Sequence, residues 1–582
     1  MEDLLRSYTW GRRGATLLAT GAAFLAVTGV AAHADVAGEL EDGTISPAAN
    51  AQKASESAAG GGAAVEMWDT SSVEIQLTNT TATSAYRIRA RQEICGGAAA
   101  QMTVKVDGVA AGGTITVAAT TYTDYTVPGS WAAGAHTVRV DFVNPYFQTD
   151  CVARELWLDR VTAVSAATGK TYYVDRTAPA GGNGLSTSAA WDSIADVNAA
   201  ALKPGDTVLF RSGQTWTGAN LTITAAGTSS ARITVGSYGG SVLPIFDGGG
   251  GTTGTAGSHP ITVAGAFVTV QDVLVRNGGT SDKTGLAVTG DDVLVQRVTA
   301  SGNAIGVQAY DGADRLRVTG STLSNNKTVI APSGGDDDYG ASGVVVLSAA
   351  GVEVDHNTIS GNVGTSPDFG FDGSAVEVFG AVDLTVHHNT ATDNQTFSEL
   401  GNDAATSHLT RGTWFYDNVI STSASFSAGQ VLGVNVQGTE GRFGGASGTK
   451  VTNNTFVLRN SGAGALIAGI GADVVFHNNI VQADQAGYTY ERKIDEGHNL
   501  YWGWSYIEGI KSTANTSSAG GIAPSSATAN PLFVSGTDLH LQTGSPAKNF
   551  GSSAYGVTTD RDDRQRVVGT GVDAGAYELQ VP

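Results

Sequence analysis

The stretch "VDHNTI" (residues 354–359) decides the fold, because related stretches recur along the second part of the chain. Each begins with a large apolar residue and most carry polar residues at their centre. The related stretches are "VQDVLV", "VQRVTA", "VTGSTL", "VHHNTA", "FYDNVI", "VTNNTF" and "FHNNIV", which begin at residues 270, 295, 318, 386, 415, 451 and 476. The shortest intervals between them are 23 and 25 residues, and the longer intervals carry insertions.

A repeat of this length, made of short strands without a helical period, is typical of one coil of a right-handed parallel β-helix. A single coil cannot bury its apolar face, whereas stacked coils share a core and pair strands about 4.8 Å apart. We therefore predict an all-β chain with a right-handed parallel β-helix of roughly ten coils over residues 168–582. One aligned position predicts a hydrogen-bonded asparagine ladder in a turn: Asn357, Asn389, Asn418, Asn454 and Asn479.

The first part of the chain has a different organisation. Residues 1–34 combine a basic start, an apolar run and the small-residue ending "AHA", which predicts a secretory signal peptide and a secreted protein without membrane attachment after cleavage. Residues 35–62 are rich in Ala, Ser and Gly and lack periodicity, so we expect a flexible linker. Residues 63–167 alternate apolar and polar residues, as in "MTVKVDG", and predict a small β-sandwich.

Composition narrows the classes of partner. The net charge is −21 with only 15% charged residues, which argues against nucleic acid, whose phosphates require Lys and Arg. The chain has two cysteines, Cys95 and Cys151, and in an exported protein we expect them to form a disulfide. We expect a monomer.

Residues 170–580 resemble the pectate-lyase-like right-handed β-helix superfamily. The resemblance is carried by the opening "YYVDRTAPAGGNGLSTSAAWDSIADVN" and by the closing "NPLFVSGTDLHLQTGSPAKNFG" followed by "DAGAYE". It implies a polysaccharide-active β-helix, but the superfamily includes hydrolases, lyases, epimerases and non-enzymatic fibres.

The front module resembles calcium-dependent xylan-binding modules through "YRIRARQEICGGAAAQMTVKVDG" and "HTVRVDFVNPYFQTDCVARELWLDRVTA". Members typically carry acids where this chain has Pro145 and Ala153. Calcium requires several oxygen ligands, so we expect no metal site and no required cofactor. Asp150 or Glu155 could substitute for the missing acids, which keeps calcium as an alternative.

Two glutamates stand one coil apart. The strands "GVQAY", "GVVVL", "AVEVF" and "GVNVQ" align, with their valines facing inward and Gln308, Val345, Glu377 and Asn435 facing outward. Glu399 in "FSELG" follows Glu377 by 22 residues and should join this ridge, roughly 5 Å away. That separation is typical of the acid and nucleophile of a retaining glycosidase.

Insertions on both sides of this ridge predict loops that form the walls of a substrate groove. Reserve catalytic candidates are Asp372 and Asp403. The predicted substrate-binding residues are Gln308, Tyr339, Asn435, His408, Arg411 and Trp414. His387 and His388 precede a ladder asparagine, and we interpret both as turn-packing residues.

We therefore expect a secreted glycoside hydrolase that acts on a plant or microbial polysaccharide. A polysaccharide lyase acting on uronates is the alternative, although it would need a Lys or Arg base, and the groove candidates are richer in acids. A non-catalytic carbohydrate-binding or adhesin-like β-helix is the second alternative.

Overall fold

The computed structural model describes residues 36–580 except 96–97, 149–151, 166–168, 219, 250–258, 279–281, 332–337, 368–369, 403–407, 424, 427–431, 440–442, 460–463, 470–471, 484–493 and 504–521. The chain separates into two compact units with a boundary near residue 169, one residue from the predicted boundary. None of the helices in the described ranges has the length and apolar character needed to cross a membrane. The predicted signal peptide and Cys151 lie outside the described residues, so secretion and the disulfide with the buried Cys95 remain predictions.

The first unit is the predicted antiparallel β-sandwich. One sheet has the order β3-β4-β13-β6-β9, with β1 also paired to β13, and the other has the order β2-β5-β10-β7-β8. The strands of the first sheet are β1 (Val36–Glu39), β3 (Ala51–Ser55), β4 (Ala63–Met67), β6 (Thr83–Glu93), β9 (Thr123–Trp131) and β13 (Glu155–Ser165). The other elements are β2 (Thr44–Ser46), β5 (Ser71–Asn79), β7 (Ala100–Val106), β8 (Val109–Val117), β10 (Gly134–Phe142), the β11 (Phe147–Gln148) and β12 (Val152–Ala153) hairpin, and 3-10 turns η2 (Leu40–Asp42) and η3 (Gly60–Gly62).

The prediction of a flexible linker at residues 35–62 is wrong. Strands β1, β2 and β3 lie in this segment and pair with β13, β5 and β4, and Leu40 is fully buried in the sandwich core. These strands are short and mostly exposed. They are held by backbone hydrogen bonds to neighbouring strands and not by an apolar face. Such pairing does not require alternating apolar and polar residues, so it leaves little periodicity in the sequence.

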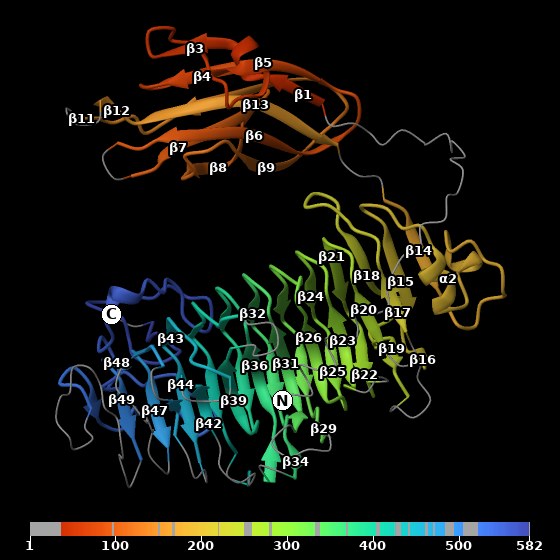
Figure 1. Ribbon diagram of the computed structural model, residues 1–582, viewed down its shortest axis with the longest axis vertical. Helices are drawn as coiled ribbons and strands as arrows, with labels where there is room; N and C mark the ends of the chain where they lie inside the picture. The colour runs from red at the N-terminus through yellow and green to blue at the C-terminus, as the bar shows by residue number, and fades with distance from the viewer. Residues whose placement is uncertain are drawn as a thin grey trace. The chain divides into compact units, whose positions relative to one another are not determined.

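The second unit is a parallel β-helix with three long sheets (Figure 1). The β14–β48 sheet contains β14 (Thr171–Val174), β15 (Thr207–Arg211), β18 (Ile233–Tyr238), β21 (Val268–Gln271), β24 (Leu294–Gln296), β27 (Arg317–Thr319), β32 (Glu353–Asp355), β37 (Thr385–His387), β40 (Trp414–Tyr416), β43 (Thr449–Thr452), β46 (Val474–His477) and β48 (Ile494–Gly497). The β16–β50 sheet contains β16 (Thr215–Thr217), β19 (Ile245–Asp247), β22 (Leu274–Arg276), β25 (Thr299–Ser301), β28 (Thr322–Ser324), β33 (Thr358–Ser360), β38 (Thr390–Thr392), β41 (Val419–Ser421), β44 (Thr455–Leu458), β47 (Ile480–Ala483), β49 (Leu500–Trp502) and β50 (Ala527–Thr528). The β17–β45 sheet contains β17 (Leu221–Ile223), β20 (Ile261–Val263), β23 (Thr284–Val288), β26 (Ile305–Ala309), β31 (Ser342–Leu347), β36 (Ser374–Phe379), β39 (Thr396–Gly401), β42 (Leu432–Val436) and β45 (Leu466–Ala468).

The β-helix unit also contains shorter elements outside its three long sheets. Two small antiparallel hairpins are inserted between coils, β29 (Val329–Ile330) with β30 (Tyr339–Gly340), and β34 (Gly364–Ser366) with β35 (Gly370–Asp372). A short helix, α2 (Ile194–Ala199), and the 3-10 turns η4 (Thr187–Ala189) and η5 (Ser553–Tyr555) complete the elements of the described ranges.

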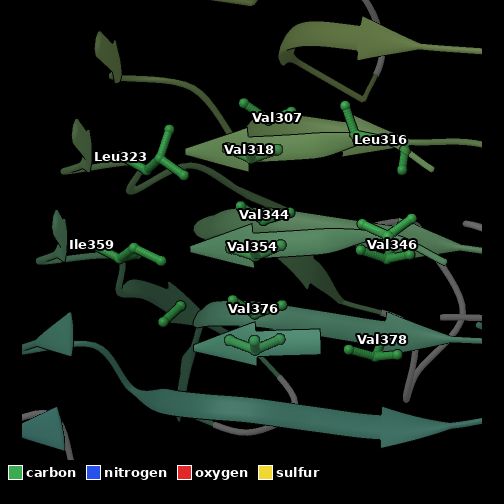
Figure 2. Packing of buried hydrophobic residues seen from close by; sticks show 14 of the residues in the cluster. Val307, Leu316, Val318, Leu323, Val344, Val346, Val354, Ile359, Val376 and Val378 are labelled. Atoms are coloured by element: carbon green, nitrogen blue, oxygen red, sulfur yellow. The ribbon is translucent and has the colours of Figure 1, made fainter. Parts of the chain in front are cut away.

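The register confirms the repeat alignment. Val270, Val295, Val318, Val354, Val386, Phe415, Val451 and Phe476, the first residues of the recurring stretches, are successive strand partners. Their side chains belong to one continuous buried core. In Figure 2 the valines stack coil on coil, with Val307, Val344 and Val376 above one another on the β17–β45 sheet.

The asparagine ladder is confirmed as well. Each asparagine side chain donates to the side-chain oxygen of the next, at 3.0 Å from Asn357 to Asn389 and 2.9 Å from Asn418 to Asn454. The same oxygen also accepts from the backbone amide of the preceding coil's asparagine. The ladder therefore satisfies buried donors at every turn and fixes the vertical alignment of the coils.

Residues 529–580, here called the return segment, run back along the outside of the coils. Asn478 binds Ser552, Thr455 binds Ala576, and Asp417 binds Arg566. Arg566 is fully buried and also donates to the Gly575 carbonyl. The return segment is thus anchored to several earlier coils.

Candidate functional site

Glu377 and Glu399 are direct neighbours on the outer face of the β17–β45 sheet. Glu377 on β36 is the register partner of Glu399 on β39. The row continues to Val345 and Gln308 on one side and to Asn435 on the other. Strands in such a sheet lie about 4.8 Å apart, so the ridge expected from the sequence is present with the two acids side by side.

The local sequence explains why the two carboxylates face outward. In "SAVEVF" Val376 and Val378 enter the core and are fully buried, so Glu377 between them projects to the other face. In "TFSELG" the flanking Ser398 and Leu400 occupy the equivalent inward positions. The outward acids are half-buried because insertions cover part of the sheet.

Glu377 has the surroundings of a proton donor. Its Oε2 accepts hydrogen bonds from the hydroxyls of Ser342, at 3.0 Å, and Ser374, at 3.5 Å. Its neighbour in the preceding coil is the buried, apolar Val345. Burial, followed by the charge of Glu399, raises the pKa of Glu377 to about 7. A carboxyl group with such a pKa stays protonated at mildly acidic pH.

Glu399 has a more polar environment. Its Oε1 accepts a hydrogen bond of 2.6 Å from the Gln437 side-chain amide. Asn435, its partner on β42, is half-buried and offers a second amide beside the pair. The two carboxyl groups are therefore chemically unequal, which suits an acid and a nucleophile at one bond.

The reserve acids have other positions. Asp372 ends the inserted strand β35, where its Oδ1 accepts from the Gly373 backbone amide at 2.7 Å, as a turn-capping aspartate does. Asp403 lies outside the described residues. Both stay predictions as catalytic residues.

Two predicted substrate-binding residues are corrected, because Gln308 and Tyr339 are buried. Gln308 is 0% exposed and accepts from the Thr284 hydroxyl at 2.6 Å. Tyr339, on the inserted β29–β30 hairpin, packs with Val345 and Phe379 in an apolar cluster on the outer face of the sheet. A sugar therefore cannot reach either side chain.

The prediction for Trp414 is also wrong in its placement. Trp414 begins β40 in the β14–β48 sheet, on a different face from the glutamates. There it packs on Tyr416 and donates from Nε1 to the Thr452 hydroxyl at 2.9 Å. Sequence distance from Glu399 suggested a shared loop, but the chain has already turned into the next sheet. His408 and Arg411 are exposed in the segment that leads to this strand.

The predicted groove itself is not delimited. Parts of the loops around the glutamates, including 332–337, 403–407 and 440–442, lie outside the described residues. A surface hollow of about 440 Å³ lies instead at the start of the β-helix, beside α2 and Trp216. Neither Glu377 nor Glu399 lines this hollow.

Asn144, in the stretch of the front module that resembles calcium-dependent modules, is held by hydrogen bonds within the protein. The Asn144 carbonyl, in the stretch that resembles the calcium-dependent modules, accepts a hydrogen bond of 2.7 Å from the Arg154 guanidinium. The Asn144 side chain is bound to the backbone of Gln101 and Ala99. Arg154 is 5% exposed. The Asn144 oxygens are thus bound to donors of the protein, and the possible ligand Asp150 lies outside the described residues, so the expectation of no required calcium stays a prediction.

Among the described residues, two groups of side chains could hold a metal ion: His356 with His388 and Asp563, and Glu353 with Asp355 and His387. Both His387 and His388 are buried at the turn, as the turn-packing interpretation expected. The sequence analysis did not assign them a ligand role. The signal that could have found one is the recurrence of histidine at aligned positions in "VDHNTI" and "VHHNTA".

Comparisons with known families follow this division of the chain. Residues 208–499 match the model of the family described as right-handed β-helix region. Residues 85–172 match the family described as calcium-dependent carbohydrate-binding module, xylan-binding. No curated protein sequence matches the chain.

Several solved structures resemble this chain at low identity. Pectate lyase Pel9A is 16% identical over 71% of this chain and 97% of its own, with a TM-score of 0.45. The catalytic domain of a GH87 α-1,3-glucanase D1069A variant in complex with nigerose is 11% identical over 86% of this chain and 98% of its own, with a TM-score of 0.34. The GH136 lacto-N-biosidase from Eubacterium ramulus is 14% identical over 62% of this chain and 68% of its own, with a TM-score of 0.39.

Proposed function

The chain belongs to the right-handed β-helix family, and from this premise we propose that it is a secreted glycoside hydrolase that cleaves a polysaccharide. The observation that carries the proposal is the direct register of Glu377 with Glu399 on one outer sheet face. Retaining glycosidases use two carboxyl groups about 5–5.5 Å apart, and adjacent strands of a parallel sheet supply this separation.

The environments of the two acids suggest their roles. Glu377, whose pKa is raised to about 7 by burial and by Glu399, is the general acid that protonates the leaving oxygen. Glu399, held by Gln437 at 2.6 Å, attacks the anomeric carbon. Water then hydrolyses the glycosyl-enzyme intermediate, with Glu377 acting as the base. Asn435, His408 and Arg411 are the remaining candidates for contacts to the sugar.

The front module supports a polysaccharide as the substrate. Its family is described as carbohydrate-binding and xylan-binding, and a binding module concentrates an enzyme on a polymer. The described outward row of the ridge, from Gln308 to Asn435, contains no Lys or Arg. A lyase would need such a base, so we favour a neutral glycan over a uronate.

A screen of polysaccharides, xylan among them, tests the proposal when reducing ends and ultraviolet absorbance are recorded together. Hydrolysis releases reducing ends without absorbance, whereas lysis also creates an absorbing conjugated double bond. Products that absorb would replace the hydrolase by the lyase. Binding without any cleavage across the screen would favour the adhesin-like alternative.

A second experiment assigns the roles. In the Glu399→Ala variant, azide should occupy the space of the lost nucleophile and restore turnover with formation of a glycosyl azide. In the Glu377→Ala variant, rescue should require a substrate whose leaving group needs no protonation. The reverse pattern would exchange the two roles.

A further inference from the structure

Two histidines occupy the same position in successive coils, at the turn that follows the β14–β48 sheet. His356 follows β32 and His388 follows β37, and both have a left-handed backbone with φ of 54°. Their rings stack with centroids 4.8 Å apart. Asp563 of the return segment reaches this turn from a distant part of the sequence. The nitrogen and oxygen atoms of His356, His388 and Asp563 all lie within 4.8 Å of one another.

A chain of hydrogen bonds determines the protonation of His388. Glu353 accepts from His387 Nε2 at 3.0 Å, so in a neutral imidazole the His387 Nδ1 carries a lone pair. That lone pair lies 2.8 Å from His388 Nδ1, which must therefore be the donor. Nε2 of a neutral His388 is then left with a lone pair and no proton.

This nitrogen faces other acceptors. His388 is 3% exposed, and its Nε2 has no hydrogen-bond partner. It lies 3.8 Å from Asp563 Oδ1 and 4.0 Å from Asp417 Oδ2, which is also buried without a partner. Unpaired buried acceptors that face one another are unfavourable, and a cation between them would remove the conflict.

His356 completes the arrangement. Asp355 accepts from its Nδ1 at 2.8 Å, which aims Nε2 at the Asp563 carboxylate, 3.1 and 3.2 Å away. A carboxylate behind a histidine in this way is the usual outer support of a metal-binding imidazole. Asp355 itself is paired with Arg317 through two contacts of 2.8 Å, so it serves as a support and not as a ligand.

We propose that His356 Nε2, His388 Nε2 and the Asp563 carboxylate bind a divalent transition-metal ion of the zinc type, with Asp417 Oδ2 beside it. Donors about 2.0–2.1 Å from a tetrahedral zinc ion lie about 3.3–3.4 Å from one another. The observed contacts of Asp563, 3.1 Å to His356 and 3.8 Å to His388, bracket this value. Two nitrogen donors favour zinc over calcium or magnesium, which prefer oxygen.

The ion would fasten the return segment to the β-helix. His356 and Asp563 are 207 residues apart in the sequence, and one metal ion would link them where Arg566 already binds Asp417. An ion that binds only to the folded chain stabilises it, and the stabilisation grows with the logarithm of the ion concentration once this exceeds the Kd. This inference is independent of the reaction proposed for Glu377 and Glu399.

The test compares the full-length wild-type chain, stripped with a chelator, with the Asp563→Asn variant. Asparagine keeps the shape of this exposed side chain and tolerates its left-handed backbone. The matched control is Asp495→Asn, because Asp495 is similarly exposed and binds His477 on the same sheet. Each protein is titrated with Zn²⁺ alone, with bound zinc measured by elemental analysis and unfolding measured by heating.

We expect the wild type and the control to bind one more zinc ion per chain than Asp563→Asn, or to bind it at least about tenfold more tightly. Zinc should raise the midpoint of thermal unfolding of the first two proteins and not of the third. Cobalt substituted at the same site should show the visible absorption of a tetrahedral nitrogen–oxygen site, weakened in His388→Gln. Equal zinc binding and equal thermal shifts in all three proteins, or no bound zinc in the wild type, would overturn the proposal.

Discussion

The β17–β45 and β14–β48 sheets stack ionisable residues in the same way but balance their charges differently. On the first sheet Glu377 lies directly beside Glu399, and its hydrogen bonds come from two serine hydroxyls. On the second, Asp355 is paired with Arg317, and Asp272 at the adjoining turn is paired with Arg297. The coil period brings like positions together on both faces. We infer that an acid paired with an arginine has a structural role, whereas an acid beside another acid is available for catalysis.

The largest expected effect concerns the like-charged pair. Glu377→Gln or Glu399→Gln should each lower kcat by at least about 10³-fold, roughly 4 kcal/mol of barrier, because each removes a carboxyl group from the reaction. The measurement is steady-state hydrolysis of the glycan found in the screen. The comparison variant is Asp272→Asn, which alters an exposed acid already paired with Arg297 at 2.8 Å and should leave kcat within about twofold. Near-normal turnover in both glutamine variants would refute the pair.

The next largest effect concerns the opposite arrangement, the buried ion pair of Arg566 and Asp417. Arg566→Met should lower the free energy of unfolding by about 3–5 kcal/mol, since it leaves the buried Asp417 without its counter-ion. Arg297→Met, which breaks an exposed pair, should lower it by no more than about 1 kcal/mol. Urea unfolding of both variants provides the measurement. The double variant Asp417→Asn with Arg566→Met should recover part of the lost stability. Equal losses in Arg566→Met and Arg297→Met would contradict the prediction.

A smaller effect follows from the raised pKa of Glu377, about 7 against an ordinary 4.5. Below pH about 4.5 this group is protonated in both the folded and the unfolded chain. Between pH about 4.5 and 7 the unfolded chain loses the proton first, so stability falls as the pH rises through this window. Glu377→Gln should remove this component from the pH dependence of urea midpoints. Glu399→Gln should shift this component to lower pH, because one cause of the raised pKa of Glu377 is gone. An unchanged pH profile of the urea midpoints in both variants would refute the prediction.

The smallest expected effect is on the front module, where Pro145 and Ala153 stand where the calcium-dependent modules that it resembles carry acids. Binding of the full-length Glu377→Gln variant to insoluble xylan should change by less than about twofold when EDTA is added. Co-sedimentation measures the bound fraction. A loss of binding that calcium restores, and zinc does not, would show that the module uses calcium after all.

The β-helix could be predicted from the sequence because the same residue pattern recurs in successive coils. One coil specifies little, but eight aligned segments agree on the inward residue, from Val270 to Phe476, and the asparagines agree on the turn. The register of Glu377 with Glu399 followed from the same period. The strands at residues 36–55 were missed because they are held by backbone pairing with β4, β5 and β13, which leaves no apolar pattern.

Residues outside the repeat were harder to place. Gln308 fits the outward pattern, yet its side chain is fully buried and binds Thr284. Tyr339 packs on the sheet from the inserted hairpin, and a two-residue strand such as β30 leaves little trace in a sequence. Trp414 was placed by its distance along the chain rather than by its position in the coil, where Thr385 and Lys450 are its partners. The convergence of Asp563 on His356 depends on how the return segment folds back, and no local pattern encodes such a contact.

The return segment also constrains the order in which the chain can complete its fold. Coils that share a core can add to one another in sequence as the chain emerges. Asp417, however, meets Arg566 only after a further 149 residues have been made. Until then this part of the β-helix has an uncovered flank, and the Asp417 carboxylate lacks its partner. A chain shortened by its last twenty residues should therefore resemble a folding intermediate more than a smaller version of the protein.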